Sequence, residues 1–196
     1  MEKPVFVLCG PAGSGKTTVQ HYLMDHFHLA KVVTHTTRPP RAGEVNGRDY
    51  YFENPASFAR LHLLEKVEYD HHAYGSSREG LDRALAGHPG AVIVLDTAGA
   101  VTYCNQLNTQ VVVLYLTVAS PAQLKERLEQ RGDNPAAIAS RLASAEFQRD
   151  LRLPAALAGR ATVIENDDWK QTTATLDQLV AAALMTRKEE TDDQQR

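Results

Sequence analysis

The stretch that decides the fold reads Val5-Phe6-Val7-Leu8-Cys9-Gly10-Pro11-Ala12-Gly13-Ser14-Gly15-Lys16-Thr17. Its first four residues are β-branched, aromatic or aliphatic, which predicts a buried strand from Val5 to Leu8. The glycine-rich loop fits the pattern G-x-x-x-x-G-K-[ST], and a helix is expected from Lys16 to about Phe27. A strand before the loop and a helix after it are the context that a phosphate-binding loop requires.

This loop carries its own chemistry. Its glycines let backbone N–H groups converge on phosphate oxygens, and the start of the helix adds the positive end of a dipole. Lys16 is expected to reach the β and γ phosphates of a nucleoside triphosphate, and the Thr17 hydroxyl to ligate Mg²⁺. The alternative, a glycine-rich turn that binds nothing, is disfavoured by the flanking strand and helix. The loop alone does not distinguish ATPases, GTPases and small-molecule kinases.

Composition narrows the class of protein. The chain has 196 residues, of which 43% are hydrophobic and 23% charged, as expected for a single globular domain. A formal net charge of −3 gives no general attraction to nucleic acid. No stretch approaches the roughly twenty apolar residues of a membrane span, and the apolar run before Gly10 is too short for a signal peptide. The two cysteines are too few for a disulfide framework. We therefore expect a cytoplasmic protein without nucleic-acid or membrane partners. The wholly polar residues 187–196 predict a disordered tail.

Strands and helices alternate along most of the remaining chain. Each expected strand is nearly continuous in apolar residues, which predicts a parallel sheet covered on both faces and a three-layer α/β fold. Residues 35–62 differ, because they are rich in Thr, Pro, Arg and Gly with one strand-like cluster at Asp49–Phe52, and they indicate an inserted subdomain or a long loop. The other expected strands are Val32–Val33, Ala91–Leu95, Gln110–Val118 and Ala161–Ile164. The other expected helices are Gly80–Ala86, one capped by Ser120 and ending near Gln130, one running through Arg149, and one capped by Asp168 and Gln171.

A second cluster of polar residues lies in the segment 34–52, which reads THTTRPPRAGEVNGRDYYF. It holds Arg38, Arg41 and Arg48 next to a tyrosine pair and has no periodicity of a core element. Arginine binds phosphate oxygens bidentately through its planar donors. A solvated basic loop is the alternative, but in a slightly acidic protein with a phosphate-binding loop nearby we favour a second phosphate site.

The same segment resembles the guanylate kinase family, whose hallmark is T-T-R-x-P-R-x-G-E-x-x-G-x-D-Y-x-F after a phosphate-binding loop. The similarity extends over nearly the whole chain apart from the polar tail. It implies a P-loop nucleoside monophosphate kinase fold in residues 1–186, with a core of 1–34 and 90–186, a GMP-binding insert of 35–89 and a lid of about 128–142. The further matching segments are Tyr74–Glu79, Arg127–Gly132, Ser140–Leu142 and Asn166–Asp168.

This resemblance implies transfer of the terminal phosphoryl group of ATP to GMP, with Mg²⁺, by a monomer or a homodimer. Lys16, Arg131 and Arg141 are implied to be catalytic. The implied ATP-binding residues are Gly10, Pro11, Ala12, Gly13, Ser14, Gly15, Lys16, Thr17, Thr18, Arg127 and Asn166. The implied GMP-binding residues are Arg38, Arg41, Tyr50 and Tyr74 at the phosphate and Thr34, Glu65, Ser76 and Asp96 at the guanine.

Guanine chemistry supports the role of Glu65, because guanine presents N1–H and an amino group side by side and a carboxylate accepts from both. Adenine lacks this pair of donors and would leave the buried carboxylate unpaired. For Arg127, the alternative is a surface pair with Glu126 or Glu129.

The chain also departs from the family pattern. Only one acid, Asp96, follows the central strand, where the family often has two, and the helix between Phe52 and Glu65 is expected to be about one turn short. Eight histidines are present without the spacing of a metal site. Two other functions stay open: a kinase of the ribose 1,5-bisphosphate kinase group, and a non-catalytic guanylate-kinase-like binding module.

Overall fold

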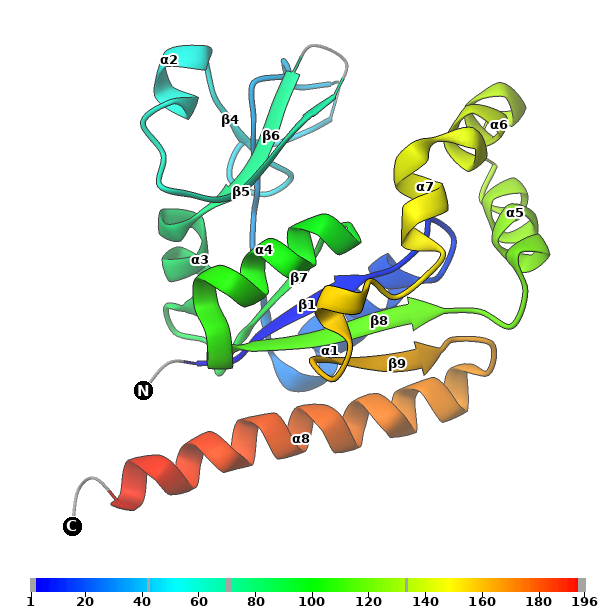
Figure 1. Ribbon diagram of the computed structural model, residues 1–196. Coiled ribbons are helices and arrows are strands. Elements are labelled where there is room, and N and C mark those ends of the chain that lie inside the picture. The colour runs from blue at the N-terminus through cyan, green and yellow to red at the C-terminus, as the bar shows by residue number, and fades with distance from the viewer. Residues whose placement is uncertain (1–2, 42, 70–71, 133, 194–196) are drawn as a thin grey trace.

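Strand β1 (Val5–Cys9) lies at the centre of a five-stranded sheet in which every pair of neighbours is parallel. The computed structural model describes residues 3–41, 43–69, 72–132 and 134–193, and Figure 1 shows the sheet with helices on both sides. Because β1 has a neighbour on each side and a helical layer on each face, all five of its residues are buried. The strand order is β2 (Ala30–Lys31), β7 (Ala91–Val94), β1, β8 (Val111–Thr117) and β9 (Ala161–Glu165).

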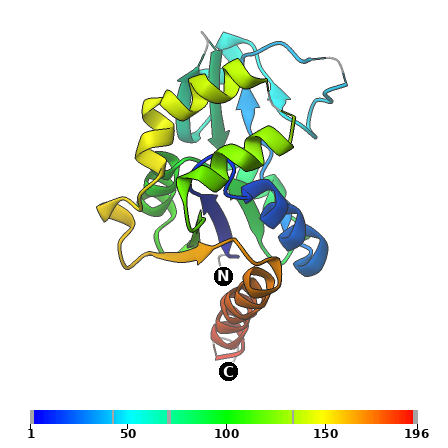
Figure 2. The same ribbon diagram turned by 90° about the vertical axis from the view of Figure 1, so that its right-hand side faces the viewer.

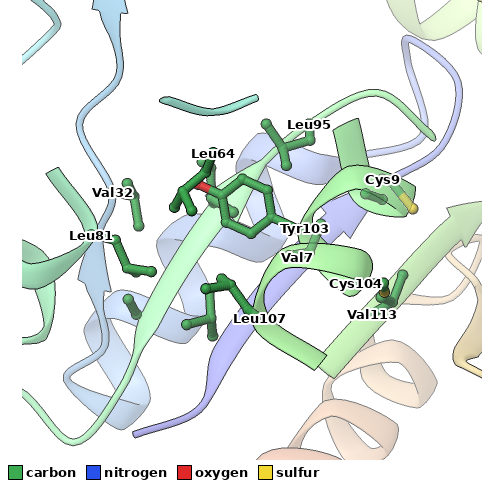
Figure 3. Close-up of a cluster of buried hydrophobic side chains, with 14 of the residues drawn as sticks. Val7, Cys9, Val32, Leu64, Leu81, Leu95, Tyr103, Cys104, Leu107 and Val113 are labelled. Atoms are coloured by element: carbon green, nitrogen blue, oxygen red, sulfur yellow. The ribbon is translucent and has the colours of Figure 1, made fainter. Parts of the chain in front are cut away.

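The two faces of β1 contribute to separate hydrophobic clusters, because side chains alternate along a strand. Phe6 and Leu8 pack with α1 (Lys16–Phe27) and α8 (Trp169–Asp193). Val7 and Cys9 pack on the other face, where α3 (Arg78–Leu85) and α4 (Thr97–Leu107) contribute Leu81 and Tyr103 (Figure 3). The expected three-layer fold is thus confirmed.

A second, four-stranded sheet stands above one end of the first (Figure 1). Its order is β4 (Tyr51–Phe52), β3 (His35–Thr36), β6 (His72–Ser77) and β5 (Leu63–Tyr69), and the short helix α2 (Pro55–Phe58) precedes β5. Strands β3 and β4 are parallel, whereas β6 pairs antiparallel with both β3 and β5.

Three helices stand on the opposite side of the phosphate-binding loop, so the loop lies between them and the small sheet (Figures 1 and 2). They are α5 (Pro121–Gln130), α6 (Pro135–Ala143) and α7 (Ala145–Asp150). Two 3₁₀ turns, η1 (Asn108–Gln110) and η2 (Ala155–Leu157), precede β8 and β9.

Several sequence-based boundaries are wrong. The second core strand is Ala30–Lys31, two residues before the expected Val32–Val33. The helix expected to run through Arg149 is broken at Ser144, whose hydroxyl accepts from Phe147 N and caps α7. Strands β3, β5 and β6 were not predicted. Strand β3 has only two residues and pairs with β6 about forty positions away. Strands β5 and β6 are neighbours in the chain, but neither LLEKVEY nor HAYGSS is a continuous apolar run.

The polar tail also differs from the expectation of disorder. Helix α8 continues to Asp193, and residues 194–196 lie outside the described residues. The first four residues of this segment, 187–190, are Arg, Lys and two Glu, which extend an existing helix at little cost. Within the described ranges, no helix is both long enough and apolar enough to cross a membrane.

A matched pair of valines tests this assignment of the core. Val113 on β8 is 1% exposed, whereas Val163 on the neighbouring strand β9 is 52% exposed. Val113→Ala should lower the free energy of unfolding by about 1.5–3 kcal/mol, because it removes buried methyl groups and leaves a cavity. Val163→Ala should change it by less than about 0.5 kcal/mol. Urea denaturation of both variants measures the difference, and equal losses would contradict the described sheet.

Candidate active site

The loop after β1 is packed so closely that two of its glycines cannot be replaced. Gly10 has a φ of +124°, and a Cβ there would lie 2.1 Å from the carbonyl oxygen of Leu116. Gly15 has a φ of +94°, and its Cβ would lie 2.2 Å from Nδ2 of Asn166. Helix α1 begins at Lys16 without a side-chain cap from Gly15, so its first N–H groups are left to bind an anion.

Lys16 is folded back onto this loop. Its Nζ donates to the carbonyl oxygens of Gly10 and Pro11 at 2.7 and 2.8 Å. Burial lowers the pKa of Lys16 from 10.5 to about 8, and the negative charge of Asp150 acts in the opposite direction. Lys16 is therefore a partly desolvated cation whose charge is accessible to a phosphate at the mouth of the loop.

A pocket of about 620 Å³ opens beside the loop. Its lining includes most of the residues predicted to bind ATP, whereas Gly10, Pro11 and Ser14 are buried. No described residue of the small sheet lines it. The lining residues are Ala12, Gly13, Gly15, Lys16, Thr17, Thr18, Arg127, Leu128, Arg131, Asn166, Asp167 and Trp169.

Arg127 and Asn166 join the elements around this pocket. Nη2 of Arg127 donates to the backbone oxygen of Asn166 at 2.8 Å and approaches a carboxylate oxygen of Asp167 at 3.4 Å. The alternative pairing of Arg127 with Glu126 or Glu129 is therefore not adopted. Nδ2 of Asn166 donates to the carbonyl oxygen of Ser14 at 2.9 Å. These bonds tie α5 and the segment after β9 to the phosphate-binding loop.

The two arginines predicted to be catalytic occupy different places. Arg131 follows the last residue of α5 and lines the pocket, whereas Arg141 lies on α6, is exposed and does not line it. Both positive charges lower the pKa of Lys16, although less than burial does. Both arginines therefore act electrostatically on Lys16 from the side of α5 and α6.

Arg38, Tyr50 and Tyr74 come together at the small sheet. The Arg38 guanidinium lies 5.6 Å from the centre of the Tyr50 ring, and the rings of Tyr50 and Tyr74 are 6.2 Å apart. Nη2 of Arg38 donates to both carboxylate oxygens of Glu44, at 2.8 and 3.0 Å, and this bond raises the pKa of Arg38. Arg41 is exposed, and its backbone N–H, not its guanidinium, donates to Glu44. Glu44 was not predicted from the sequence and orders this cluster.

Glu65 and Ser76 meet across the β5–β6 pair. Oε1 of Glu65 accepts from Ser76 N at 2.9 Å, and Oγ of Ser76 accepts from the hydroxyl of Tyr103 at 2.7 Å. Burial raises the pKa of Glu65, and electrostatic repulsion from the carboxylate of Asp96 raises it further. Thr34 contributes its backbone oxygen to Tyr51 N at 2.9 Å.

Asp96 belongs to a network that the sequence did not reveal. It caps α4 by accepting from Gly99 N at 2.6 Å, and it pairs with Nη2 of Arg149 at 2.8 Å. Nε of Arg149 bonds Oδ1 of Asp150 at 2.9 Å, and the same oxygen accepts from the Thr97 hydroxyl at 2.6 Å. No motif singles out Arg149 or Asp150, because the residues that they join, Asp96 and Thr97, lie about fifty positions away in the chain.

Thr17 is the one residue predicted from the sequence to bind a metal ion. Thr17 offers a hydroxyl in the pocket. Among the residues that the structure describes, no group of three or more His, Cys, Asp or Glu could hold a metal ion. This donor set fits an ion that takes most of its oxygen ligands from a phosphate substrate and from water, as Mg²⁺ does.

A parallel sheet with a phosphate-binding loop, a small inserted sheet on one side and a helical segment on the other defines the P-loop nucleoside monophosphate kinase fold. The chain belongs to the guanylate kinase family, whose model, described as guanylate kinase, matches residues 1–183.

Individual proteins agree with this assignment. A guanylate kinase of Thermus thermophilus is 36% identical over 153 residues, which span 76% of this chain and 69% of the relative. That of Nitrosomonas europaea is 37% identical over 153 residues, 74% of each chain. The crystal structure of guanylate kinase from Anaplasma phagocytophilum is similar with a TM-score of 0.64 and 26% identity, covering 94% of this chain and 88% of the other.

The lowered pKa of Lys16 leads to a direct measurement. In protein with ¹³C-labelled lysine, the Lys16 resonance, assigned with Lys16→Met, should titrate near pH 8, because burial disfavours the charged form. Asp150→Asn should lower this pKa further, since it removes the negative charge that favours protonated Lys16. Between pH 8 and 10.5, Lys16 binds more protons in the unfolded chain than in the folded protein. The contribution of Lys16 to the free energy of unfolding should therefore rise with pH in this range. A titration at the ordinary lysine value would contradict the described burial.

Proposed function

We propose that this protein transfers the terminal phosphoryl group of ATP to GMP, giving ADP and GDP. The proposal rests on one observation above all: the chain holds two separate sets of cationic and hydrogen-bonding groups whose chemistry suits phosphates. One surrounds Lys16 in the pocket beside α1, and the other surrounds Arg38 on the small sheet. A phosphotransferase with two phosphorylated substrates needs both sets.

On the donor side, the N–H groups of the loop and Lys16 bind the triphosphate, while Arg127 and Asn166 line the same pocket. Arg131 and Arg141 bring positive charge from the lid, and arginines in such positions are worth on the order of a thousandfold or more in rate. The Thr17 hydroxyl would hold Mg²⁺, which, when bound, neutralises charge on the β and γ phosphates.

On the acceptor side, the phosphate of GMP is bound by Arg38, Arg41, Tyr50 and Tyr74. The guanine is surrounded by Glu65, Ser76, Asp96 and Thr34. Glu65 is the main determinant of base choice, because its carboxylate accepts from guanine N1–H and the 2-amino group together. Adenine lacks this pair of donors and would leave the half-buried carboxylate with the Ser76 N–H but without the two hydrogen bonds from the base.

The chemical step requires little covalent participation by the protein. A phosphate oxygen of GMP attacks the γ phosphorus of ATP, and the bond to the β–γ bridging oxygen breaks to release ADP. Positioning and charge neutralisation by Lys16, Arg131 and Arg141 supply the rate. Since no described residue of the insert lines the donor pocket, the insert and the lid must close toward each other before transfer.

The cellular setting follows from the substrates. ATP and GMP are soluble small molecules, so we propose a cytoplasmic enzyme without nucleic-acid or membrane partners. All the proposed groups belong to one chain, so the reaction proceeds equally in a monomer or in each subunit of a homodimer.

A panel of nucleoside monophosphates with ATP and Mg²⁺ tests the reaction. In a coupled assay of ADP release, GMP should exceed AMP, CMP and UMP by at least about 100-fold in kcat/KM. Lys16→Met should remove nearly all activity, and activity preserved in that variant would indicate a contaminating kinase. Comparable rates with AMP, or transfer to ribose 1,5-bisphosphate instead of GMP, would refute the assignment.

Two glutamates on β5 provide a matched test of base recognition. Glu65→Gln should lower kcat/KM for GMP by roughly 10- to 100-fold, because it replaces charge-assisted hydrogen bonds and presents a donor to guanine. Glu68→Gln changes an exposed residue of the same strand that pairs with Lys66, and should leave kcat/KM within about twofold. Equal effects of the two substitutions would remove the assigned role of Glu65.

A further inference from the structure

Trp169 stands in an unusual place for a large apolar side chain. It is the first residue of α8, it is 43% exposed, and it lines the same pocket as Lys16 and Arg127. An exposed tryptophan in a concave site is a typical anchor for a planar ligand. Trp169 is also the only tryptophan of the chain.

The indole ring is held in position from the side of α1. Its centre lies 5.5 Å from that of Tyr22, and the two rings meet at 83° in an edge-to-face arrangement. The Tyr22 hydroxyl donates to Asp177 on α8 at 2.6 Å, and the ring of His26 stacks on that of Tyr22 at 5.1 Å. The indole of Trp169 is therefore packed against α1 through Tyr22.

The backbone that carries Trp169 is fixed as well. Asp167 accepts from Ala119 N at 2.8 Å and faces Arg127, and Asp168 caps α8 by accepting from Gln171 N at 3.0 Å. The pocket thus has a rigid aromatic wall in a segment tied to α5, and rigid walls bind ligands with a small entropic cost.

The chemistry of the pocket divides into two parts. The residues from Gly13 to Thr18 supply backbone N–H groups, an ammonium and hydroxyls, which suit phosphates. Trp169 supplies an apolar ring that suits no part of a triphosphate. A ligand that uses both parts carries phosphates at one end and a planar aromatic group at the other.

We propose that Trp169 stacks on the nucleobase of the phosphate donor and makes the donor site prefer purines to pyrimidines. The larger purine ring overlaps the indole more extensively, so the preference follows from stacking area. This inference rests on the proposed function only in taking the pocket as the donor site.

Fluorescence gives the first test, because all tryptophan emission comes from Trp169. Titration with Mg²⁺–ADP should change the emission with saturation, whereas inorganic tripolyphosphate, which has no base, should bind without a comparable change. Emission that does not respond to saturating ADP would overturn the proposal.

Calorimetry of variants gives the second test. Trp169→Ala should weaken ADP binding by roughly 5- to 100-fold, the range of aromatic–base stacking, while Trp169→Phe should stay within about threefold of the original protein. Tripolyphosphate affinity and the thermal midpoint should be unchanged in both variants. If Trp169→Ala weakened tripolyphosphate as much as ADP, the residue would be structural and the proposal wrong.

The donor preference gives the third test. With GMP as acceptor, kcat/KM should be higher for ATP than for CTP and UTP, and Trp169→Ala should reduce this difference at least about fivefold by lowering the ATP value. An unchanged ratio would refute the role in base selection. The ADP binding measurements need no turnover. An absence of GMP phosphorylation would therefore refute the proposed reaction but would leave the binding test of Trp169 valid.

Discussion

The site depends on the close contact between the loop after β1 and the ends of the neighbouring strands. Gly10 lies against the backbone of β8, and Gly15 lies against Asn166, which follows β9. These contacts leave no room for a side chain at position 10 or 15, so the loop presents backbone N–H groups together with the amine of Lys16 and the hydroxyl of Thr17. They also remove Lys16 from water, which strengthens its attraction to any phosphate that reaches it.

Three arginines around the site of this slightly acidic protein are oriented by carboxylates. Arg38 is paired with Glu44, Arg127 approaches Asp167, and Arg149 joins Asp96 to Asp150. Each carboxylate limits the conformations of a long side chain before a phosphate arrives. The phosphate then meets an oriented group, which reduces the entropic cost of binding. The arrangement also explains how two polyanions can be bound without a basic surface.

The network around Arg149 connects the two sides of the active site. Asp96 lies beside the residues expected at guanine, whereas Asp150 ends α7 at the base of the helical segment. One guanidinium bonds both carboxylates, and the charge of Asp150 also acts on Lys16, where it raises the pKa against the effect of burial. The chain has a single acid after β7, and a second carboxylate reaches the neighbourhood of that acid from a distant element.

The sequence by itself determined the features that are local. The strand, loop and helix from Val5 to Phe27 and the caps at Ser120 and Asp168 follow from short patterns, because each depends on neighbours within a few residues. The parallel sheet was predicted from the alternation of apolar strands with helices along the chain. Family resemblance extended this to the arginine–tyrosine cluster. Only the tertiary structure decided the small four-stranded sheet, the pairing of Arg149, the hydroxyl of Tyr103 on Ser76, and the position of Trp169 in the pocket. The physical reason is that the side-chain contacts join distant residues, 27 positions apart for Ser76 and Tyr103 and 53 for Asp96 and Arg149. No local pattern encodes which distant group will satisfy a buried charge or flank an aromatic ring.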